Sequence, residues 1–402
     1  MDSHDVIILG GGLIGQTMAL ALDVHGLRSV VIDPVDPAQT LTTEFDGRVT
    51  AISSSSWKMF DALGIGPLMR DEACPIARIE VRDGADGAPL DFQSDAADDA
   101  LGLMLENRVL RRALWGQIQS AAHVTRKFGT RAVSVERSAH RVTAVLDDGS
   151  TVTAPLLLVC EGRHSSTRAE AGIQVAAWDY DSLSIVTAMD HSIPHGGTAH
   201  QIFYPGGPVA LLPMQPGTRS ALVWSLPEAQ ASAMVKLGER AFLAEVGRAT
   251  RDLLGDLHLV APRAVYPLHF RHTAKMTDTR LALVGDAGHG IHPIAGQGFN
   301  LGLRDVAALA QVLVESTRLG LDLGDAQVLA RYQRWRSADV MAVTLACDSL
   351  VRLFGIKGRM AQAVRRFGLG AVQQAKPLKD LFMAEARGEN GQLPIMLTGG
   401  RV

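Results

Sequence analysis

A glycine-rich turn close to the N-terminus constrains the fold of this chain more than any other feature. The turn follows the short apolar run 6–9 and precedes a stretch of helical composition, residues 16–25. A second apolar run, residues 29–32, ends at Asp33. The order of strand, glycine turn, helix, strand and acid predicts a βαβ unit that binds a dinucleotide.

The residues of this turn have distinct predicted roles. Their GxGxxG spacing lets the backbone turn tightly and approach a pyrophosphate at the N-terminus of the following helix. Asp33 is placed to accept hydrogen bonds from a ribose hydroxyl. The predicted phosphate-binding residues are Gly10, Gly12, Leu13, Ile14 and Gly15. This motif on its own does not separate FAD from NAD.

A second segment near residue 286 selects between these two cofactors. The apolar run 281–284 leads into Gly285 and Asp286, and a helix with apolar residues at helical spacing follows residue 300. The N-terminus of that helix falls just after residues 296–298, where it would stabilise the negative charge of a reduced flavin. Asp286, at the end of a strand, is placed to bind a ribityl chain. The predicted cofactor is therefore FAD.

The same segment resembles a known family. Residues 285–289 are similar to the Gly-Asp motif of the FAD-dependent aromatic hydroxylases, the group typified by para-hydroxybenzoate hydroxylase. The HPxxGQGxN form of residues 292–300 looks like that of the ubiquinone-biosynthesis hydroxylases. Further similar blocks are residues 46–53, 106–110 and 203–213, so the resemblance runs from end to end.

The resemblance implies additional site residues. His292 and Pro293 are expected beside the flavin ring as the candidate catalytic residues, and no metal site is expected. Further cofactor contacts are expected at Arg48, Asn107, Arg108, Glu161, Gly162, Gly285, Asp286, Gly296, Gln297, Gly298, Phe299 and Asn300. The candidate substrate contacts are Gln201, Phe203, Tyr204, Leu212 and Trp224.

One block departs from the family pattern. Glu161 stands where the family's Asp-Gly motif has an aspartate, and one extra methylene displaces a carboxylate enough to disturb a bidentate contact. Because that motif serves both FAD and the transient nicotinamide in the family, the reductant stays open among NADPH, NADH and an external electron-transfer protein. Arg168 of this block either serves the cofactor site or forms a surface salt bridge.

The predicted fold class is α/β, with a Rossmann-like FAD-binding domain interleaved with an antiparallel-sheet substrate domain, followed by C-terminal helices. Within the substrate domain a single helical stretch is expected over residues 228–249. The FAD-binding domain is assigned to residues 1–75, 101–180 and 271–325, the substrate sheet to 76–100 and 181–270, and the C-terminal helical region to 326–402.

Charge narrows the range of partners. The net charge of −3 gives no global basic field that would recruit nucleic acid. Residues 352–379, however, hold seven basic residues and no acid, with apolar residues between them. Two interpretations stay open: a surface for peripheral contact with an anionic membrane or a lipid-carrying partner, and a solvated helix face over core. We expect a cytoplasmic protein, at the inner face of the membrane under the first interpretation.

The resemblance also implies a reaction. It is the FAD-dependent hydroxylation of the aromatic ring of a polyprenylated phenol in ubiquinone biosynthesis, with O₂ as co-substrate, through reduced flavin and a flavin hydroperoxide. Two alternatives stay open: a hydroxylase or epoxidase of another aromatic or polyprenyl substrate, and an FAD-bearing structural partner in a biosynthetic complex. Other ubiquinone-biosynthesis proteins are expected partners, and the oligomeric state is not predicted.

Overall fold

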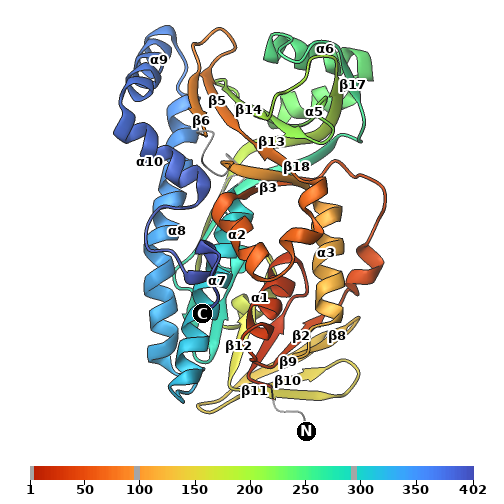
Figure 1. The fold of residues 1–402 in the computed structure, drawn as a ribbon, viewed down its shortest axis with the longest axis vertical. Coiled ribbons are helices and arrows are strands. Elements are labelled where there is room, and N and C mark those ends of the chain that lie inside the picture. Colours follow the sequence, from red (N-terminus) through yellow and green to blue (C-terminus); the bar gives the residue numbers. More distant parts are fainter. Residues whose placement is uncertain (1–3, 95–99, 291–296) are drawn as a thin grey trace.

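A six-stranded sheet forms the core of the half of the molecule that contains the N-terminal glycine turn. The computed structural model describes residues 4–94, 100–290 and 297–402 (Figure 1). The sheet order is β19-β20-β12-β1-β2-β8, and all neighbours are parallel except β19 and β20. These strands are β1 (Val6–Leu9), β2 (Ser29–Asp33), β8 (Val124–Phe128), β12 (Leu156–Val159), β19 (Thr277–Asp278) and β20 (Leu281–Leu283).

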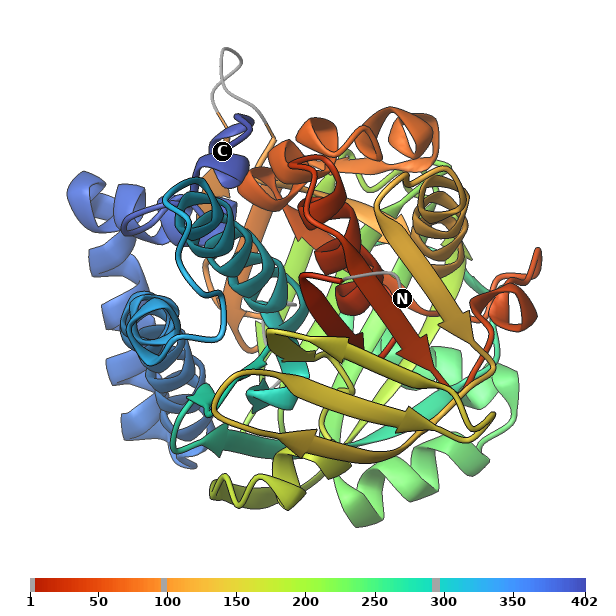
Figure 2. The ribbon, with the colours of Figure 1, turned by 90° about the horizontal axis from the view of Figure 1, so that it is seen from below.

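Both faces of this sheet are covered, which explains why its central strands β1, β12 and β20 are apolar throughout. Val6 and Ile8 of β1 pack among the helices α1 (Leu13–Asp23), α3 (Asn107–Gln119) and α7 (Gln297–Arg318). Ile7 and Leu9 face the other way. They pack toward a small antiparallel meander, formed by β9 (Ala132–Arg137), β10 (Val142–Leu146) and β11 (Thr151–Ala154) (Figure 2).

A nine-stranded sheet forms the other half, in the upper part of Figure 1. Its order is β21-β18-β13-β16-β15-β14-β5-β6, with β17 paired to β13. Its strands are β5 (Arg78–Asp83), β6 (Leu90–Gln93), β13 (Val175–His191), β14 (Thr198–Phe203), β15 (Val209–Met214), β16 (Arg219–Pro227), β17 (Leu257–Leu259), β18 (Ala264–Thr273) and β21 (His289–Gly290). Because segments of the six-stranded half flank these strands in sequence, the two halves interleave, and the predicted fold class is confirmed.

The two faces of the large sheet have different neighbours. Leu211 and Leu222 pack against α5 (Glu228–Lys236) and α6 (Glu239–Thr250). Leu212 lies on the opposite face, where it packs with Phe45 and Val49. These two residues face it from the half of the molecule that contains the N-terminal glycine turn, which we call the nucleotide-binding half. This second face is the one that a cofactor held in the other half could reach.

Two sequence predictions for this sheet were wrong in detail. The helical stretch 228–249 is two helices, because the backbone is extended at Leu237 and at Gly238, a residue of low helix propensity that caps α6. The sheet is also not wholly antiparallel, since β14 and β5 pair in parallel. β5 comes from an earlier part of the chain, so no hairpin dictates its direction.

Smaller elements join the two halves. A three-stranded sheet, β3-β7-β4, lies between them, and α2 follows β3 directly. These elements are β3 (Val49–Ser53), α2 (Ser54–Ala62), β4 (Cys74–Ile76), β7 (Gly102–Glu106), the short helix α4 (Ser166–Glu170) and the 3₁₀ turns at Pro37–Thr40, Gly66–Leu68, Arg70–Glu72, Gly285–Ala287 and Ile395–Thr398.

The C-terminal region is helical, as the sequence predicts. α8 (Ala326–Gly355) begins where the Asp325 side chain accepts a hydrogen bond from the backbone nitrogen of Gln327 at 2.7 Å. It runs along one side of the molecule to α9 (Arg359–Gln374) and α10 (Lys376–Arg387) (Figure 1). Among the described residues, no helix combines the length and the apolar character needed to cross a membrane.

Candidate cofactor and substrate site

The N-terminal glycines form a turn that other residues cannot replace without strain. Gly10 has a φ of +101°, and a Cβ on Gly15 would lie 1.8 Å from the carbonyl oxygen of Gly10. The helix α1 therefore approaches β1 as closely as the predicted motif requires. Gly12 differs from these two, because a Cβ there would meet no atom within 4 Å. The space beside Gly12 is open to a ligand.

The N-terminus of α1 is prepared for an anion. Gly12 is its N-cap, no side chain caps it among the described residues, and its first turn, which begins with Leu13 and Ile14, holds no acid. The first N–H groups of a helix lack intrahelical partners and carry partial positive charge. A pyrophosphate can accept hydrogen bonds from these N–H groups, and its negative charge is stabilised by their partial positive charge. This turn therefore fits the phosphates of a dinucleotide.

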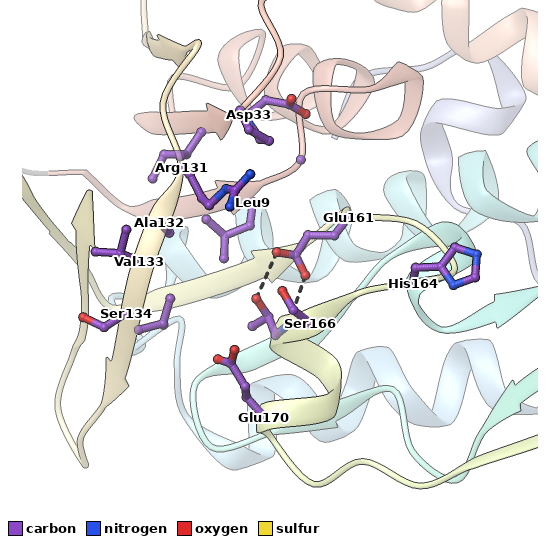
Figure 3. Close-up of a pocket in the computed structure, with 15 residues that line it drawn as sticks. Leu9, Asp33, Arg131, Ala132, Val133, Ser134, Glu161, His164, Ser166 and Glu170 are labelled. Carbon is purple, nitrogen blue, oxygen red and sulfur yellow. Dashed lines mark hydrogen bonds between the residues drawn. The ribbon is translucent and has the colours of Figure 1, made fainter. Parts of the chain in front are cut away.

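Asp33 supports the same turn from the end of β2. Its two carboxylate oxygens accept hydrogen bonds from the backbone nitrogens of Gly11, at 2.6 Å, and Val35, at 2.7 Å. Asp33 also lines a pocket of about 270 Å³ (Figure 3). Ligand sites commonly range from about 300 to 1,000 Å³, so this pocket has room for one end of a dinucleotide. Its other walls include Leu9, Arg131 and Glu161.

Glu161 lines this pocket, but its carboxylate is engaged by α4. It accepts hydrogen bonds from Ser165 Oγ at 2.5 Å and from the backbone nitrogen and Oγ1 of Thr167 at 3.2 and 3.0 Å. Figure 3 shows the Glu161 carboxylate pointing toward this helix. The longer side chain thus reaches the first turn of α4 and satisfies a helix N–H group. Gly162, the next residue, has a φ of +77° and turns the chain.

Arg168 of α4 is buried and bonds to backbone. Its guanidinium donates to the carbonyl oxygens of Ala287 and Arg163, each at 2.9 Å. The interpretation of Arg168 as part of a surface salt bridge is therefore wrong. Burial lowers the pKa of Arg168, and the nearby Arg271 lowers it further. The contact to Ala287 fastens α4 to the second predicted cofactor segment.

The second segment lies directly against the first. A Cβ on Gly302 of α7 would lie 2.8 Å from Cδ1 of Ile14 and 3.3 Å from Cα of Gly285. Glycine at 302 thus lets α7, α1 and the Gly285–Ala287 turn meet. The Asp286 side chain is 44% exposed, and its carboxylate lies 4.0 Å from Arg163. It remains accessible to a ligand, as its predicted role requires.

A fully buried aspartate holds the Gly-Asp turn in place. One oxygen of Asp305 accepts from the backbone nitrogen of Gly285 at 2.9 Å and lies 2.6 Å from Nε2 of His289. The other accepts from Nε of Arg336 at 2.6 Å. Burial alone would raise the pKa of Asp305, but His289 and Arg336 outweigh it and hold the pKa below its usual value.

This network continues to the C-terminal region. Arg336 also pairs with Asp339, which accepts from Arg304 at 2.8 Å. Arg304 donates to the carbonyl oxygens of Gly388 and Asn390 at 3.2 and 2.7 Å. Burial opposes the charge on Arg336, but Asp305 and Asp339 raise its pKa above the usual value. The sequence prediction missed Arg336 and Arg304, because nothing local marks either residue.

The remaining predicted cofactor contacts of the first half surround β3 and the start of α3. Nε of Arg48 donates to Asp46 at 2.7 Å, and this bond raises the pKa of Arg48. Asn107 accepts from Thr50 Oγ1 at 2.6 Å. Arg108 bonds to Glu106 and to the carbonyl oxygen of Thr43.

Arg111 was missed by the sequence prediction, although it lies one helical turn after Asn107. Burial lowers its pKa, and the nearby Arg48 lowers it further. The Asp46 carboxylate, whose pKa both Arg48 and Arg111 lower, offsets part of the repulsion between the two guanidinium groups. The signal that could have found Arg111 is its i, i+4 relation to Asn107 on α3.

The predicted residues of the glutamine-glycine segment are only partly described. His292, Pro293 and Gly296 lie outside the described residues. Gln297, Gly298 and Phe299 form the partly buried start of α7. Asn300 is buried, and its amide bonds the backbone of Ser53 and Ala51, each at 2.9 Å, so it joins α7 to β3.

The candidate substrate residues separate onto two faces of the large sheet. Leu212 faces the nucleotide-binding half. Gln201 and Phe203 alternate with Ile202, which packs toward α5 and α6, so they point the other way. Phe203 stacks on Phe354 of α8, with ring centroids 3.9 Å apart.

Tyr204 and Trp224 pack on the helix-covered side of the sheet, away from Leu212, and their role as substrate contacts stays a prediction. Trp224 belongs to the core under α5 and α6. The Tyr204 hydroxyl donates to the carbonyl oxygen of Ala249 at 2.5 Å. A substrate between the sheet and the other half would meet neither ring, because the sheet itself intervenes.

Known proteins are similar to this chain both in sequence and in fold. A family described as FAD binding domain matches residues 3–346. The ubiquinone hydroxylase UbiL of Rhodospirillum rubrum is 41% identical over 384 residues, covering 96% of this chain and 89% of that protein. The 3-demethoxyubiquinol 3-hydroxylase of Escherichia coli is 32% identical over 386 residues, covering 96% and 98%.

Solved structures agree on the fold. A p-nitrophenol 4-monooxygenase from Pseudomonas putida superposes with a TM-score of 0.79 at 16% identity, covering 98% of this chain and 100% of that one. HpxO from Klebsiella pneumoniae, complexed with FAD, superposes with a TM-score of 0.74 at 20% identity, covering 96% and 99%. The family match and the two sequence relatives show that the chain belongs to the FAD-dependent aromatic hydroxylases, that it is similar to those of ubiquinone biosynthesis, and that its cofactor is FAD.

Proposed function

We propose that this enzyme hydroxylates the aromatic ring of a polyprenylated phenol during ubiquinone biosynthesis, with O₂ as co-substrate. The observation that carries the proposal is the full-length similarity to UbiL, whose name states a ubiquinone hydroxylase. The similarity to the Escherichia coli hydroxylase, which covers 98% of that protein, supports the same reaction class. We also propose that other proteins of the pathway and the membrane surface are its partners.

The chain's own residues would hold the cofactor at two places. The α1 N-terminus at Gly12 would bind the pyrophosphate, and Asp33 would bind the adenosine ribose beside the pocket of Figure 3. Asp286 would bind the ribityl chain. Bound FAD supplies the redox chemistry and the reaction with O₂.

The protein contributes orientation and exclusion of water. Leu212 packs among apolar residues between the large sheet and the other half, an environment that suits an apolar substrate and keeps water away from the reacting atoms. Gln201 lies on the same side of the sheet, and its side chain forms no hydrogen bond with the described residues. We propose that it orients the ring hydroxyl.

Quinone analysis of a bacterial strain that lacks its own ring hydroxylases tests this function. Expression of the chain should restore ubiquinone, and the intermediate that disappears identifies the ring position. A strain that contains folded, FAD-loaded protein but makes no ubiquinone would refute the proposal. If such protein hydroxylated another phenol, the first alternative would hold. A loss of complex assembly without any turnover would point to the structural-partner alternative.

A further inference from the structure

α9 has two apolar sides, and the fold covers only one of them. Leu369 and Val372 pack toward β5 and β6. Met360, Val364 and Phe367 point away, with 81%, 66% and 80% of each residue exposed. Their i, i+4, i+7 spacing places them in one stripe along the helix. An exposed stripe of this kind in a soluble domain marks an interaction site.

The stripe is accompanied by cations that have no carboxylate partner. Residues 352–379 contain seven basic residues and no acid. Three of the seven are engaged: Arg352 by Asp348, Arg365 by the Asp83 carboxylate, and Arg366 by the Asp83 carbonyl oxygen. The other four form no ion pair within the described part of the chain: Lys357, Arg359, Lys376 and Lys379.

The charge of the whole molecule is polarised toward this region. The chain holds 39 basic and 42 acidic residues, so removing the seven basic residues of 352–379 leaves 32 against 42, a net charge of −10. An anionic surface would attract the α9 region and repel the remainder, which orients the approaching molecule. We define the α9 surface as the stripe Met360, Val364 and Phe367 with the four unpaired cations.

We propose that the α9 surface docks the enzyme on an anionic lipid bilayer. The apolar stripe would enter the boundary between headgroups and acyl chains, and the cations would lie at the anionic headgroups. A second copy of the chain fits this surface poorly, because a two-fold interface would place like charges against each other. Docking would help catalysis only if the substrate is the proposed polyprenylated phenol. The binding of the α9 surface to a bilayer does not depend on that proposed function.

The position of the substrate sheet supports this orientation. A pocket of about 390 Å³ adjoins α9 and is lined by Gln362 and Arg366 together with Phe203 of β14. The end of a candidate substrate strand therefore lies at the α9 end of the molecule (Figure 1). A substrate held in a bilayer beneath α9 would be close to that strand.

Vesicle flotation of the FAD-loaded enzyme tests the proposal. Binding to vesicles of equal parts phosphatidylglycerol and phosphatidylcholine should be at least about tenfold tighter than to phosphatidylcholine alone. It should weaken as salt screens the charges. Replacing the stripe by Met360→Ser, Val364→Ser and Phe367→Ser, or the cations by Lys357→Gln, Arg359→Gln and Lys376→Gln, should each reduce binding about tenfold or more.

A matched control uses exposed apolar residues outside this region. Leu68, Ile193 and Leu319 are 54%, 49% and 72% exposed, and changing all three to serine should leave vesicle binding unchanged. Equal losses in the two serine variants, or equal binding to neutral and anionic vesicles, would overturn the proposal. So would light scattering that shows a dimer which only the stripe variant converts to a monomer. Normal vesicle binding without ubiquinone restoration would sink the proposed function and leave the docking surface intact.

Discussion

Asp305 and Gly285 are joined by a 2.9 Å hydrogen bond from the Gly285 backbone nitrogen to the buried carboxylate. Gly285 begins the Gly-Asp turn, and Asp305 lies two turns into α7. The same carboxylate binds His289 and Arg336, so one buried anion links the cofactor turn to α7 and α8. The geometry of the turn therefore depends on buried charges, since Asp305 and Arg336 are both shielded from solvent.

Removing the Arg336 side chain should lower the free energy of unfolding. Arg336→Met leaves Asp305 without its guanidinium partner, and breaking a buried pair typically costs about 3–5 kcal/mol. Arg334→Met, an exposed change on the same helix, should stay within about 0.5 kcal/mol. Urea unfolding monitored by circular dichroism measures both variants. Similar unfolding midpoints would show that the buried pair contributes little.

The same network predicts that the stability of the fold depends on pH in the acid range. The pKa of Asp305 is lowered in the folded state, so its stabilisation is fully present above the ordinary aspartate pKa of about 3.9 and is lost as the pH falls through the folded-state value. The stability gap between wild type and Asp305→Asn should therefore be large at pH 7 and shrink below about pH 4. A gap that stays constant across this range contradicts the assignment.

Two glycine changes should separate packing from cofactor binding. Gly15→Ala places a Cβ 1.8 Å from the Gly10 carbonyl oxygen, so it should destabilise the protein even without FAD. Gly12→Ala meets no protein atom within 4 Å, so it should leave the apoprotein stable and weaken FAD binding. Thermal unfolding of the apoproteins and FAD titration give the two readouts. The assignment of the N-terminal glycine turn to the FAD pyrophosphate fails if Gly12→Ala binds FAD as tightly as wild type.

Glu161 should act mainly on stability. Glu161→Ala removes the acceptor for α4 and, by comparison with helix caps, should cost about 0.5–2 kcal/mol. Thr167→Val, which removes one of the same hydrogen bonds, should give a smaller loss in the same direction. FAD affinity should fall by less than tenfold in both. A large loss of affinity at unchanged stability would instead assign the carboxylate directly to the cofactor.

The two faces of the large sheet should respond differently. Leu212→Trp fills space on the side that faces the other half, so it should raise the KM for the phenol while FAD stays bound. Trp224→Leu removes a ring from the core under α5 and α6 and should lower the thermal midpoint with little effect on KM. Steady-state kinetics and calorimetry distinguish the outcomes, and the reverse pattern would place the substrate on the other face.

Local motifs explain what the sequence could predict. Residues 10–15 are close in sequence, so covalent geometry alone nearly determines their turn, and the structure shows the predicted close approach of Gly10 and Gly15. The alternation of side chains along a strand would also have separated Tyr204 from Phe203, since neighbouring residues face opposite sides. Choosing candidate substrate residues by type alone does not use this alternation.

Long-range choices could not be predicted in this way. Asp305 and Arg336 are 31 residues apart, and only the packing of α7 against α8 brings them to 2.6 Å. The break at Gly238 is different, because the low helix propensity of glycine marks it in the sequence itself.

The central claim is that the N-terminal glycine turn and the Gly285–Ala287 turn together hold one FAD. Its most direct test is FAD titration of purified apoprotein. The loaded protein should show flavin absorbance at about 370 and 450 nm and bind FAD in a one-to-one ratio. Gly12→Ala and Asp286→Ala should each weaken this binding at least about tenfold, a loss of about 1.4 kcal/mol. A folded protein that stays colourless and takes up no FAD would contradict the account.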